Sequence, residues 1–331
     1  MEMNWSNRKI LVTGAGGFIG SHLTESLVKL GAQVRAFVRY NSRNDRGYLD
    51  TLPADVKSAL EIYVGDLKDP SAVRNAVRGN DLVFHLGALI AIPYSYINPM
   101  DFVQTNLVGT ANVLNACLES KVERLIHTST SEVYGTLHYA PIDEAHPISG
   151  KSPYAASKIG ADQLALSYYC SFGLRVTVIR PFNTYGPRQS LRAIIPTVIT
   201  QALNSDQIHL GALHPTRDFN YVTDTVNGFL KAVSVERSIG EVINLGTGRE
   251  ISILQLCEIV RQLVGHELPI HEEKRRMRPA ASEVERLICN NLKARQMLEW
   301  QPRVTLEDGL QKTIEWIKLN SGQPQAVEYV I

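Results

Sequence analysis

A tyrosine and a lysine four residues apart are the side chains of this sequence best suited to acid–base chemistry. They are Tyr154 and Lys158, in the segment YAASK. On a helix, residues at i and i+4 lie one above the other, so the ammonium could lower the phenol pKa from about 10 toward neutrality. A phenolate at neutral pH is a general base. This spacing also occurs on exposed helices without any function, so the rest of the sequence must decide between the two interpretations.

Three further polar side chains precede this pair, in the segment STSEVYG at 129–135. Thr130 and Ser131 offer hydroxyls, and Glu132 offers a carboxylate. A hydroxyl can donate a hydrogen bond to a reacting oxygen, and a carboxylate can remove a proton from a carbon that a neighbouring ketone has acidified. The two segments together supply a complete set of groups for redox-driven acid–base chemistry.

A glycine-rich turn near the N-terminus offers a binding place for a dinucleotide. Gly14, Gly17 and Gly20 follow the apolar run 9–13 and open a helical pattern that continues to about residue 30. The turn needs residues without a Cβ, the backbone must approach a pyrophosphate, and the helix must pack closely on the strand. Because the motif has a strand before it and a helix after it, we expect a bound dinucleotide here.

The elements that must position these groups alternate between strand and helix, which predicts an α/β fold with a Rossmann-type, doubly wound parallel sheet. The apolar runs expected to form strands are 9–13, 33–38, 60–64, 81–86, 123–129 and 174–180. The helical patterns between them lie at about 19–30, 70–78, 100–119 and 154–172.

We expect two domains. Residues 1–180 would bind the dinucleotide, together with a returning segment at about 220–250 whose residues 241–245 rejoin the first sheet. A smaller, mixed α/β domain over 181–331, discontinuous in sequence, would bind the substrate. Helices are expected over 250–319, with a strand near 285–289.

Composition agrees with a globular enzyme and limits its partners. The 331 residues are 44% hydrophobic and 20% charged, which suffices for a large core. The net charge of +1 gives no general attraction to nucleic acid or anionic membranes. We expect a cytoplasmic protein, because no apolar run reaches about 18 residues and the N-terminus lacks a signal-peptide core. The four cysteines are scattered without a C-x-x-C pair, which predicts free buried thiols and no metal site.

The sequence resembles, over nearly its whole length, the extended short-chain dehydrogenase/reductases of the NAD(P)-dependent sugar-nucleotide epimerase/dehydratase family. The segments that carry the resemblance are TGAGGFIG at 13–20, GDL at 65–67, HLGA at 85–88, STSEVYG at 129–135, YAASK at 154–158, RPFN at 180–183, YGPR at 185–188 and RDF at 217–219. Within the family, FVRYNSRN at 37–44 and RPAASEVERL at 278–287 are similar to the 4,6-dehydratases of legionaminic acid biosynthesis.

This resemblance implies a reaction and a role for each catalytic candidate. A 4,6-dehydratase oxidises C4 of the sugar, eliminates water across C5 and C6 and returns the hydride to C6. Tyr154 would take the O4 proton, Lys158 would lower the Tyr154 pKa and bind the nicotinamide ribose, and Thr130 would donate to O4. Glu132 would remove the C5 proton, and Ser131 or Glu132 would assist departure of the C6 hydroxyl. The dTDP-glucose dehydratases have an Asp where this sequence has Ser131, whereas the GDP-mannose dehydratases share its TSE triplet.

The resemblance also implies the binding residues. The implied cofactor contacts are Gly14, Gly17, Phe18, Ile19, Gly20, Arg39, Asp66, Leu67, Leu86, Tyr154 and Lys158, with Asp66 at the adenine amino group. The implied substrate contacts are Asn183, Arg188, Arg217 and Arg278, since arginine forks match phosphate oxygens.

The end of the second predicted strand bears on the choice of cofactor. NAD-binding relatives have an acid there that bonds the adenosine ribose and would repel a 2′-phosphate. Here Val38 stands in place of the acid and Arg39 follows it, which favours NADP over NAD. The alternative is that Arg39 and Arg43 only coat the surface while NAD binds without the acid.

The substrate is expected to be a UDP- or GDP-linked hexose, with N-acetylglucosamine as the preferred sugar. UDP-glucuronate decarboxylases also contain TSEVYG, but they usually keep the acid that Val38 replaces. Nucleotide-sugar 4-epimerases share the tyrosine base but typically lack a carboxylate at Glu132. A non-catalytic dinucleotide sensor is a remote alternative, because all four catalytic groups are present. By resemblance, the helices at 100–119 and 154–172 would pair with a second subunit into the four-helix bundle of a homodimer.

Overall fold

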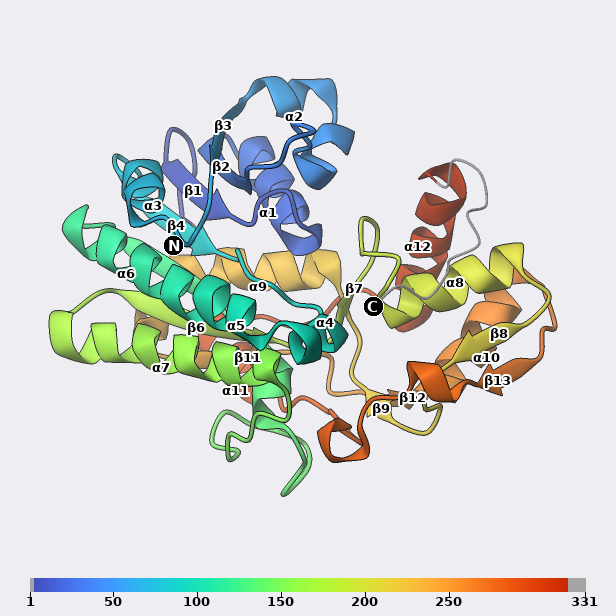
Figure 1. Ribbon diagram of the computed structural model, residues 1–331. Helices are drawn as coiled ribbons and strands as arrows, with labels where there is room; N and C mark the ends of the chain where they lie inside the picture. The colour runs from blue at the N-terminus through green and yellow to red at the C-terminus, as the bar shows by residue number, and fades with distance from the viewer. Residues whose placement is uncertain (1–2, 321–331) are drawn as a thin grey trace.

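A parallel sheet of seven strands forms the centre of the computed structural model, which describes residues 3–320 (Figure 1). Its strand order is β11–β6–β5–β4–β1–β2–β3, and every neighbouring pair is parallel. The strands are β1 (Lys9–Thr13), β2 (Gln33–Arg39), β3 (Leu60–Gly65), β4 (Leu82–His85), β5 (Arg124–Thr128), β6 (Val176–Pro181) and β11 (Val242–Leu245). The predicted doubly wound sheet is confirmed. Its order reverses between β1 and β4, where such sheets bind ligands at the carboxyl ends of their strands.

Helices cover both faces of this sheet because alternate strand residues point to opposite sides. Ile10 of β1 packs in one core with helices α1 (Phe18–Lys29) and α9 (Val222–Ser234). Its neighbour Leu11 packs in the other core, with α3 (Pro70–Val77), α6 (Gly109–Glu119) and α7 (Pro153–Phe172).

The helix expected over 100–119 consists of three consecutive segments. They are α5 (Pro99–Phe102), a π-helical segment η2 (Val103–Val108) and α6. The π segment carries Asn106, which is fully buried and bonds to the backbone of Leu89 and to Ser157 Oγ. A π segment inside a helix frequently marks a functional site.

The remaining elements are short helices and a second lobe. The short helices are η1 (Gly47–Thr51), α2 (Ala54–Ser58), α4 (Ile92–Ile97), η3 (Ser131–Tyr134), η4 (Glu236–Ser238) and α11 (Leu292–Leu298). The second lobe contains α8 (Ile194–Asn204), α10 (Ile253–Val264), η5 (Lys274–Arg276), η6 (Ala280–Ser282) and α12 (Leu306–Asn320). Its strands pair as β7 (Thr184–Tyr185) with β10 (Asn220–Tyr221), β8 (Ile208–Leu210) with β13 (Ile270–Glu272), and β9 (Thr216–Arg217) with β12 (Ile251–Ser252).

The prediction of a strand near 285–289 is wrong. Arg286 forms an isolated bridge with Thr216, and Cys289 forms one with Ile142. Because Thr216 belongs to β9 and Ile142 to the loop between η3 and α7, no continuous ladder forms. Residues 321–331 of the predicted substrate domain lie outside the described residues.

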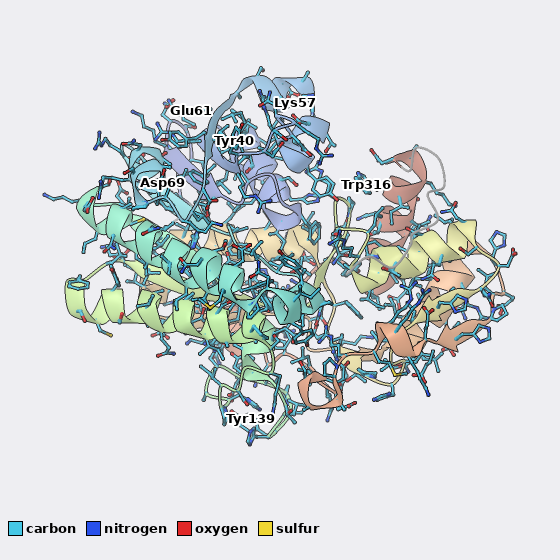
Figure 2. The ribbon with its side chains drawn as sticks, viewed as in Figure 1. Tyr40, Lys57, Glu61, Asp69, Tyr139 and Trp316 are labelled. Atoms are coloured by element: carbon cyan, nitrogen blue, oxygen red, sulfur yellow. The ribbon has the colours of Figure 1, made fainter. Side chains whose placement is uncertain are left out.

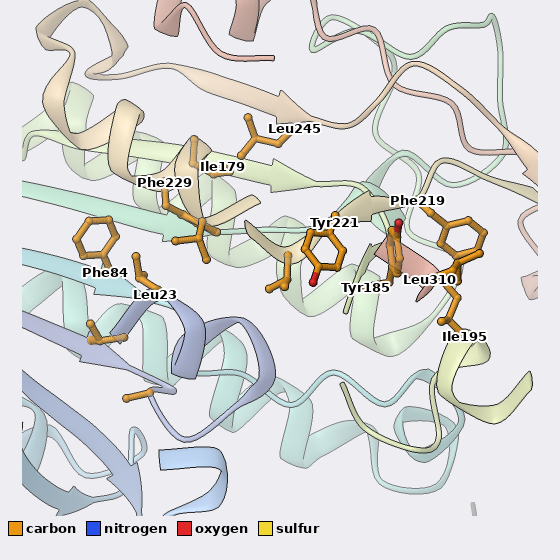
Figure 3. Close-up of a cluster of buried hydrophobic side chains, with 14 of the residues drawn as sticks. Leu23, Phe84, Ile179, Tyr185, Ile195, Phe219, Tyr221, Phe229, Leu245 and Leu310 are labelled. Carbon is orange, nitrogen blue, oxygen red and sulfur yellow. The ribbon is translucent and has the colours of Figure 1, made fainter. Parts of the chain in front are cut away.

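A continuous apolar core joins the second lobe to the sheet (Figure 3). The ring of Tyr185 lies 5.5 Å from that of Tyr221 and 6.2 Å from that of Phe219. At the opposite edge of the lobe, Trp316 of α12 (Figure 2) lies with its ring 6.3 Å from that of Tyr48 in η1. The two parts therefore contact each other at more than one place.

Some expectations about the whole molecule can be compared directly with the fold. Within residues 3–320, no helix is both long and apolar enough to cross a membrane. All four cysteines are free, but Cys170 is exposed, so the expectation of buried thiols is wrong for this residue. It lies in the last turn of α7.

Candidate active site

The glycine-rich turn has the geometry that a bound pyrophosphate requires. Gly14 has a φ of +70°, and a Cβ on it would lie 2.8 Å from the amide nitrogen of Gly87. A Cβ on Gly20 would overlap the carbonyl oxygen of Gly14. Gly17 caps α1 without a side-chain hydrogen bond, so no side chain competes for the amides of the first turn, which begins with Phe18 and Ile19. The turn and the helix start therefore fit a dinucleotide pyrophosphate.

Other predicted cofactor residues gather beside this turn. Leu67 is buried, and its Cδ1 would lie 2.7 Å from a Cβ on Gly87. Leu86 directly follows β4 and is partly buried. Asp66 directly follows β3; its Oδ1 accepts a hydrogen bond from the amide of Lys68. These residues surround the carboxyl ends of β1, β3 and β4.

Arg39 lies at the outer edge of this group. It is the last residue of β2, pairs with Gly65 of β3 and is exposed, as is Tyr40 after it (Figure 2). The loop that follows returns to the glycine turn, because a Cβ on Gly16 would overlap the carbonyl oxygen of Arg46. A basic loop therefore lies next to the turn that would hold the cofactor.

Tyr154 and Lys158 reach from α7 to the residues that follow β5. The phenol of Tyr154 hydrogen-bonds with Thr130. The ammonium of Lys158 donates to the carbonyl oxygen of Thr128 at 2.5 Å. Both α7 side chains are buried, and the relative exposures are 8% for Tyr154 and 4% for Lys158.

The expected lowering of the Tyr154 pKa is not found in this structure. Burial raises the pKa of Tyr154 well above its ordinary value; the hydrogen bond with Thr130 lowers it again only in part, and the carboxylates of Glu132 and Asp162 raise it further. Burial also lowers the pKa of Lys158 to about 8, against a raising effect of Asp162. The prediction fails because burial outweighs the other effects on the Tyr154 pKa, while the Lys158 ammonium donates to the Thr128 carbonyl.

Thr130, Ser131 and Glu132 form a tight turn at the carboxyl end of β5. Thr130 caps the start of η3, and its Oγ1 accepts a hydrogen bond from the amide of Glu132 at 3.2 Å. Ser131 is 2% exposed and Glu132 is 9% exposed. The turn directs Thr130 to Tyr154 and places Glu132 close enough to act on the Tyr154 pKa.

Two arginines of the second lobe face Glu132. Nη1 of Arg278 lies 3.9 Å from Oε2 of Glu132 and 3.9 Å from Oε1 of Glu283. Arg217 is 6% exposed and donates from Nη2 to Glu283 at 3.2 Å. Burial lowers the pKa of Arg217, whereas the charges of Glu132 and Glu283 raise it and that of Arg278 lowers it. The structure thus brings Arg217 and Arg278, which are far apart in sequence from Glu132, to the same place.

The other two predicted substrate residues differ from each other. Asn183 is partly buried, and its Oδ1 has no hydrogen-bond partner within residues 3–320, so it is free to accept one. Arg188 instead pairs through Nη2 with Glu25 of α1 at 2.7 Å. Its Nη1 has no hydrogen-bond partner within residues 3–320. The substrate contact of Arg188 stays a prediction.

A buried polar network beneath Lys158 was not predicted from the sequence. Asp162 is fully buried and accepts hydrogen bonds from Ser129 Oγ at 2.7 Å and from Nε and Nη2 of Arg180 at 3.1 and 3.0 Å. His127 Nε2 lies 3.2 Å from its other oxygen. One signal was available: Asp162 follows Lys158 by four residues, as Lys158 follows Tyr154.

No set of three or more His, Cys, Asp and Glu side chains within residues 3–320 has an arrangement that could hold a metal ion. The groups that the described site offers for catalysis and binding are the acid–base side chains and the arginines named above.

Comparison with known proteins assigns a family to this arrangement. The family model for GDP-mannose 4,6-dehydratase matches residues 11–313. The chain is 34% identical to a dTDP-glucose 4,6-dehydratase of an Actinoplanes species, over 94% of this chain and 98% of the relative. It is 32% identical to a UDP-N-acetyl-alpha-D-glucosaminuronate decarboxylase of Bacillus cytotoxicus, over 94% of this chain and 98% of the relative.

The crystal structure of DesIV, a dTDP-glucose 4,6-dehydratase from Streptomyces venezuelae with NAD and TYD bound, superposes with a TM-score of 0.85 at 29% identity. The match covers 95% of this chain and 98% of that chain. Other relatives carry the names of 4-epimerases. The chain therefore belongs to the GDP-mannose 4,6-dehydratase-like family of extended short-chain dehydrogenase/reductases, which are nucleotide-sugar enzymes that use a dinucleotide cofactor.

Proposed function

We propose that this protein is a nucleotide-sugar 4,6-dehydratase that converts a UDP- or GDP-linked hexose to its 4-keto-6-deoxy form. One observation carries the proposal: the Glu132 carboxylate lies in the same buried site as the Tyr154 phenol and the Thr130 hydroxyl. An epimerase needs the phenol and the hydroxyl, but it has no step for which a carboxylate beside the sugar is required. Elimination of water needs a base at C5.

Each catalytic side chain then has one task. A bound nicotinamide would accept the hydride from C4 and return it to C6. Tyr154 must be ionised to the phenolate to take the proton from O4, and Thr130 donates a hydrogen bond to that oxygen. Lys158 remains charged beneath them and bonds the nicotinamide ribose. Glu132 takes the C5 proton, and Ser131 or Glu132 supplies a proton to the departing C6 hydroxyl.

The second lobe would hold the diphosphate of the substrate. Arg217 and Arg278 offer guanidinium groups that match phosphate oxygens, and the free Oδ1 of Asn183 lies on a loop that pairs with the same lobe. We accordingly assign residues 1–180 and about 220–250 to the cofactor and the rest of 181–331 to the substrate. N-acetylglucosamine is our preferred sugar, since the resemblance to dehydratases of legionaminic acid biosynthesis points to a precursor of a nonulosonic acid.

For the cofactor we propose NADP in preference to NAD. Val38 is buried at the end of β2, and Arg39 and the loop with Arg43 and Arg46 lie where a 2′-phosphate would be recognised. The related DesIV structure contains NAD, so NAD is the competing choice. Titration of the protein with each dinucleotide tests this proposal: NADP should bind at least about tenfold more tightly, a ratio that corresponds to 1.4 kcal/mol. Selective binding of NAD would refute it.

A decarboxylase is the second candidate, because one observation favours it. The guanidinium of Arg278 lies 3.9 Å from Glu132, where it could pair with a carboxylate on C6 of a uronic acid. The C4 ketone would then drive loss of carbon dioxide from C5 in place of water.

One set of incubations separates these functions. UDP- and GDP-linked N-acetylglucosamine, GDP-mannose and UDP-glucuronate are each supplied, and the products are identified by NMR. A 4-keto-6-deoxy product without added reductant supports the dehydratase. Release of carbon dioxide from UDP-glucuronate would support the decarboxylase. Inversion at C4 without any other change would support the epimerase, and no turnover of any substrate would support the dinucleotide sensor.

We further infer that two copies associate through α6 and α7. Apolar side chains of α7 and of the α5–η2 segment that leads into α6 are exposed in the single chain: Met100 (60%), Val108 (37%), Tyr169 (39%) and Phe172 (58%). A partner that covered them would bury this apolar surface. Light scattering should give about twice the chain mass of 36.8 kDa. A particle of single-chain mass at micromolar concentration would refute the dimer.

A further inference from the structure

The catalytic pair on α7 is part of a longer stripe. Tyr154, Lys158 and Asp162 follow one another at intervals of four residues, so they lie along one side of the helix. Tyr154 is nearest the start of α7 and Asp162 lies deepest, with no exposed surface.

Each member of the stripe meets a successive residue at the end of β5. Lys158 Nζ donates to the Thr128 carbonyl at 2.5 Å, and Ser129 Oγ donates to Asp162 at 2.7 Å. Thr130 bonds the phenol of Tyr154. The spacing of the ammonium and the phenol is therefore fixed by the same strand end that holds the Asp162 carboxylate.

The charges around Lys158 leave Asp162 as the anion that can balance it. His85 of β4 and His127 of β5 face the ammonium. Burial lowers the pKa of both, and Asp162 acts in the opposite direction on that of His127. Arg180 of β6 is a second buried cation. Burial raises the pKa of Asp162, but His127, Arg180 and Lys158 together hold it below the ordinary value.

We propose that Asp162 is a positioning residue whose carboxylate keeps the Lys158 ammonium charged and held beneath Tyr154. Two buried cations, Lys158 on the stripe and Arg180 on β6, therefore interact with one anion. Without the anion, the repulsion between the cations must be relieved. Lys158 is the one to lose its proton, because guanidinium groups keep theirs and Arg180 has a raised pKa.

The titration of Lys158 can be measured directly in the full chain without substrate. The chain is labelled with ¹⁵N-lysine, the Nζ signal of Lys158 is assigned from its loss in Lys158→Arg, and its midpoint is followed against pH by NMR. We expect a midpoint of about 8 in the native chain. In Asp162→Asn it should fall by about one pH unit or more, the usual effect of one opposite charge close by.

Three variants separate this role from a merely structural one. Arg180→Gln removes the second cation and should not lower the midpoint. Asp162→Asn combined with Arg180→Gln avoids an unpaired arginine in the core, and it should titrate about one pH unit below Arg180→Gln alone. Asp218→Asn is the matched control, since Asp218 is equally buried but bonds Thr247, Gly248 and Cys289. It should lower stability and leave the Lys158 midpoint in place.

The effect of Asp162 on catalysis rests on the proposed function. If that function holds, the decrease of kcat/KM at alkaline pH should shift together with the Lys158 midpoint. The role of Asp162 is overturned, whatever the activity, if the Lys158 midpoint is the same in Asp162→Asn as in the native chain. It is also overturned if the double variant has the same midpoint as Arg180→Gln. A shifted midpoint in a chain that turns over no sugar nucleotide keeps that role and refutes the proposed function.

Discussion

The two sides of the candidate site are built differently. On the α7 side, Tyr154 and Lys158 are buried, and the contacts that hold Lys158 and Asp162 to the end of β5 are 2.5 to 2.7 Å long. On the second-lobe side, Arg278 lies 3.9 Å from each of two carboxylates, and it follows the short helical segment η5. One side is fixed by a strand of the central sheet and a long helix, and the other is formed by the two-residue strand β9 and the segment after η5.

This difference teaches which groups are preorganised for reaction and which can rearrange. Reacting groups must be held to within a fraction of an ångström, and rigid elements do this best. Charged pairs at 3.9 Å are weaker, so a diphosphate can replace them. Changes on the α7 side should therefore reduce kcat, and changes on the second-lobe side should mainly raise KM.

The largest effect is expected for Tyr154→Phe. It removes the group that takes the O4 proton, so both C4 oxidation and dehydration should fall by about 10³-fold or more, toward the upper range for a general base. Rapid-mixing measurements of nicotinamide reduction and product NMR test the two events separately. A variant that still oxidised C4 at a normal rate would show that the base is another group.

Glu132→Gln should separate the two events. C4 oxidation remains possible, but the C5 proton is not removed, so reduced nicotinamide should accumulate while 4-keto-6-deoxy product falls by about 10²-fold. Absorbance and product NMR on the same sample provide the measurement. Near-normal dehydration would contradict the role of Glu132, and so would loss of C4 oxidation in a variant that still binds substrate.

Arg217→Gln tests the second-lobe side. Its guanidinium is buried against Glu283, and without it the diphosphate loses one charged donor pair, so KM should rise by about tenfold or more with kcat changed little. Arg286→Gln is the control, since Arg286 is about half exposed and pairs with Glu250. A loss confined to kcat would mean that this side is as preorganised as the other.

The same comparison explains what the sequence could predict. Regular elements reveal themselves by periodicity, and all six predicted strands of the first half are present because each is an apolar run between turn residues. The Tyr154–Lys158 pair follows from helix geometry alone. Asp162 lies at the next step of the same spacing, but the sequence does not show that Arg180 arrives from β6 to meet it.

The failures lie where tertiary contacts override local signals. The sequence suggested that Lys158 lowers the Tyr154 pKa, yet the ammonium bonds the Thr128 carbonyl and burial dominates. The sequence also did not indicate that Arg188 pairs with Glu25 of α1. That contact and the meeting of Arg278 with Glu132 depend on how the second lobe folds back on the sheet, for which no pattern in the chain is diagnostic.

The smallest effect is expected at the joint between the two sides, where His22 of α1 hydrogen-bonds the carbonyl oxygen of Pro187. Burial lowers the pKa of His22 from 6.5 to about 4, with the Pro187 bond raising it and Arg188 lowering it. Between these two pH values the unfolded chain binds a proton that the folded chain does not. Stability should therefore fall as pH drops from 6.5 toward 4, and His22→Asn should reduce that fall because asparagine does not titrate. Denaturant unfolding at several pH values measures it, with the exposed His214→Asn as control. Equal pH dependence in the native chain and His22→Asn would show that acid weakens another part of the molecule first.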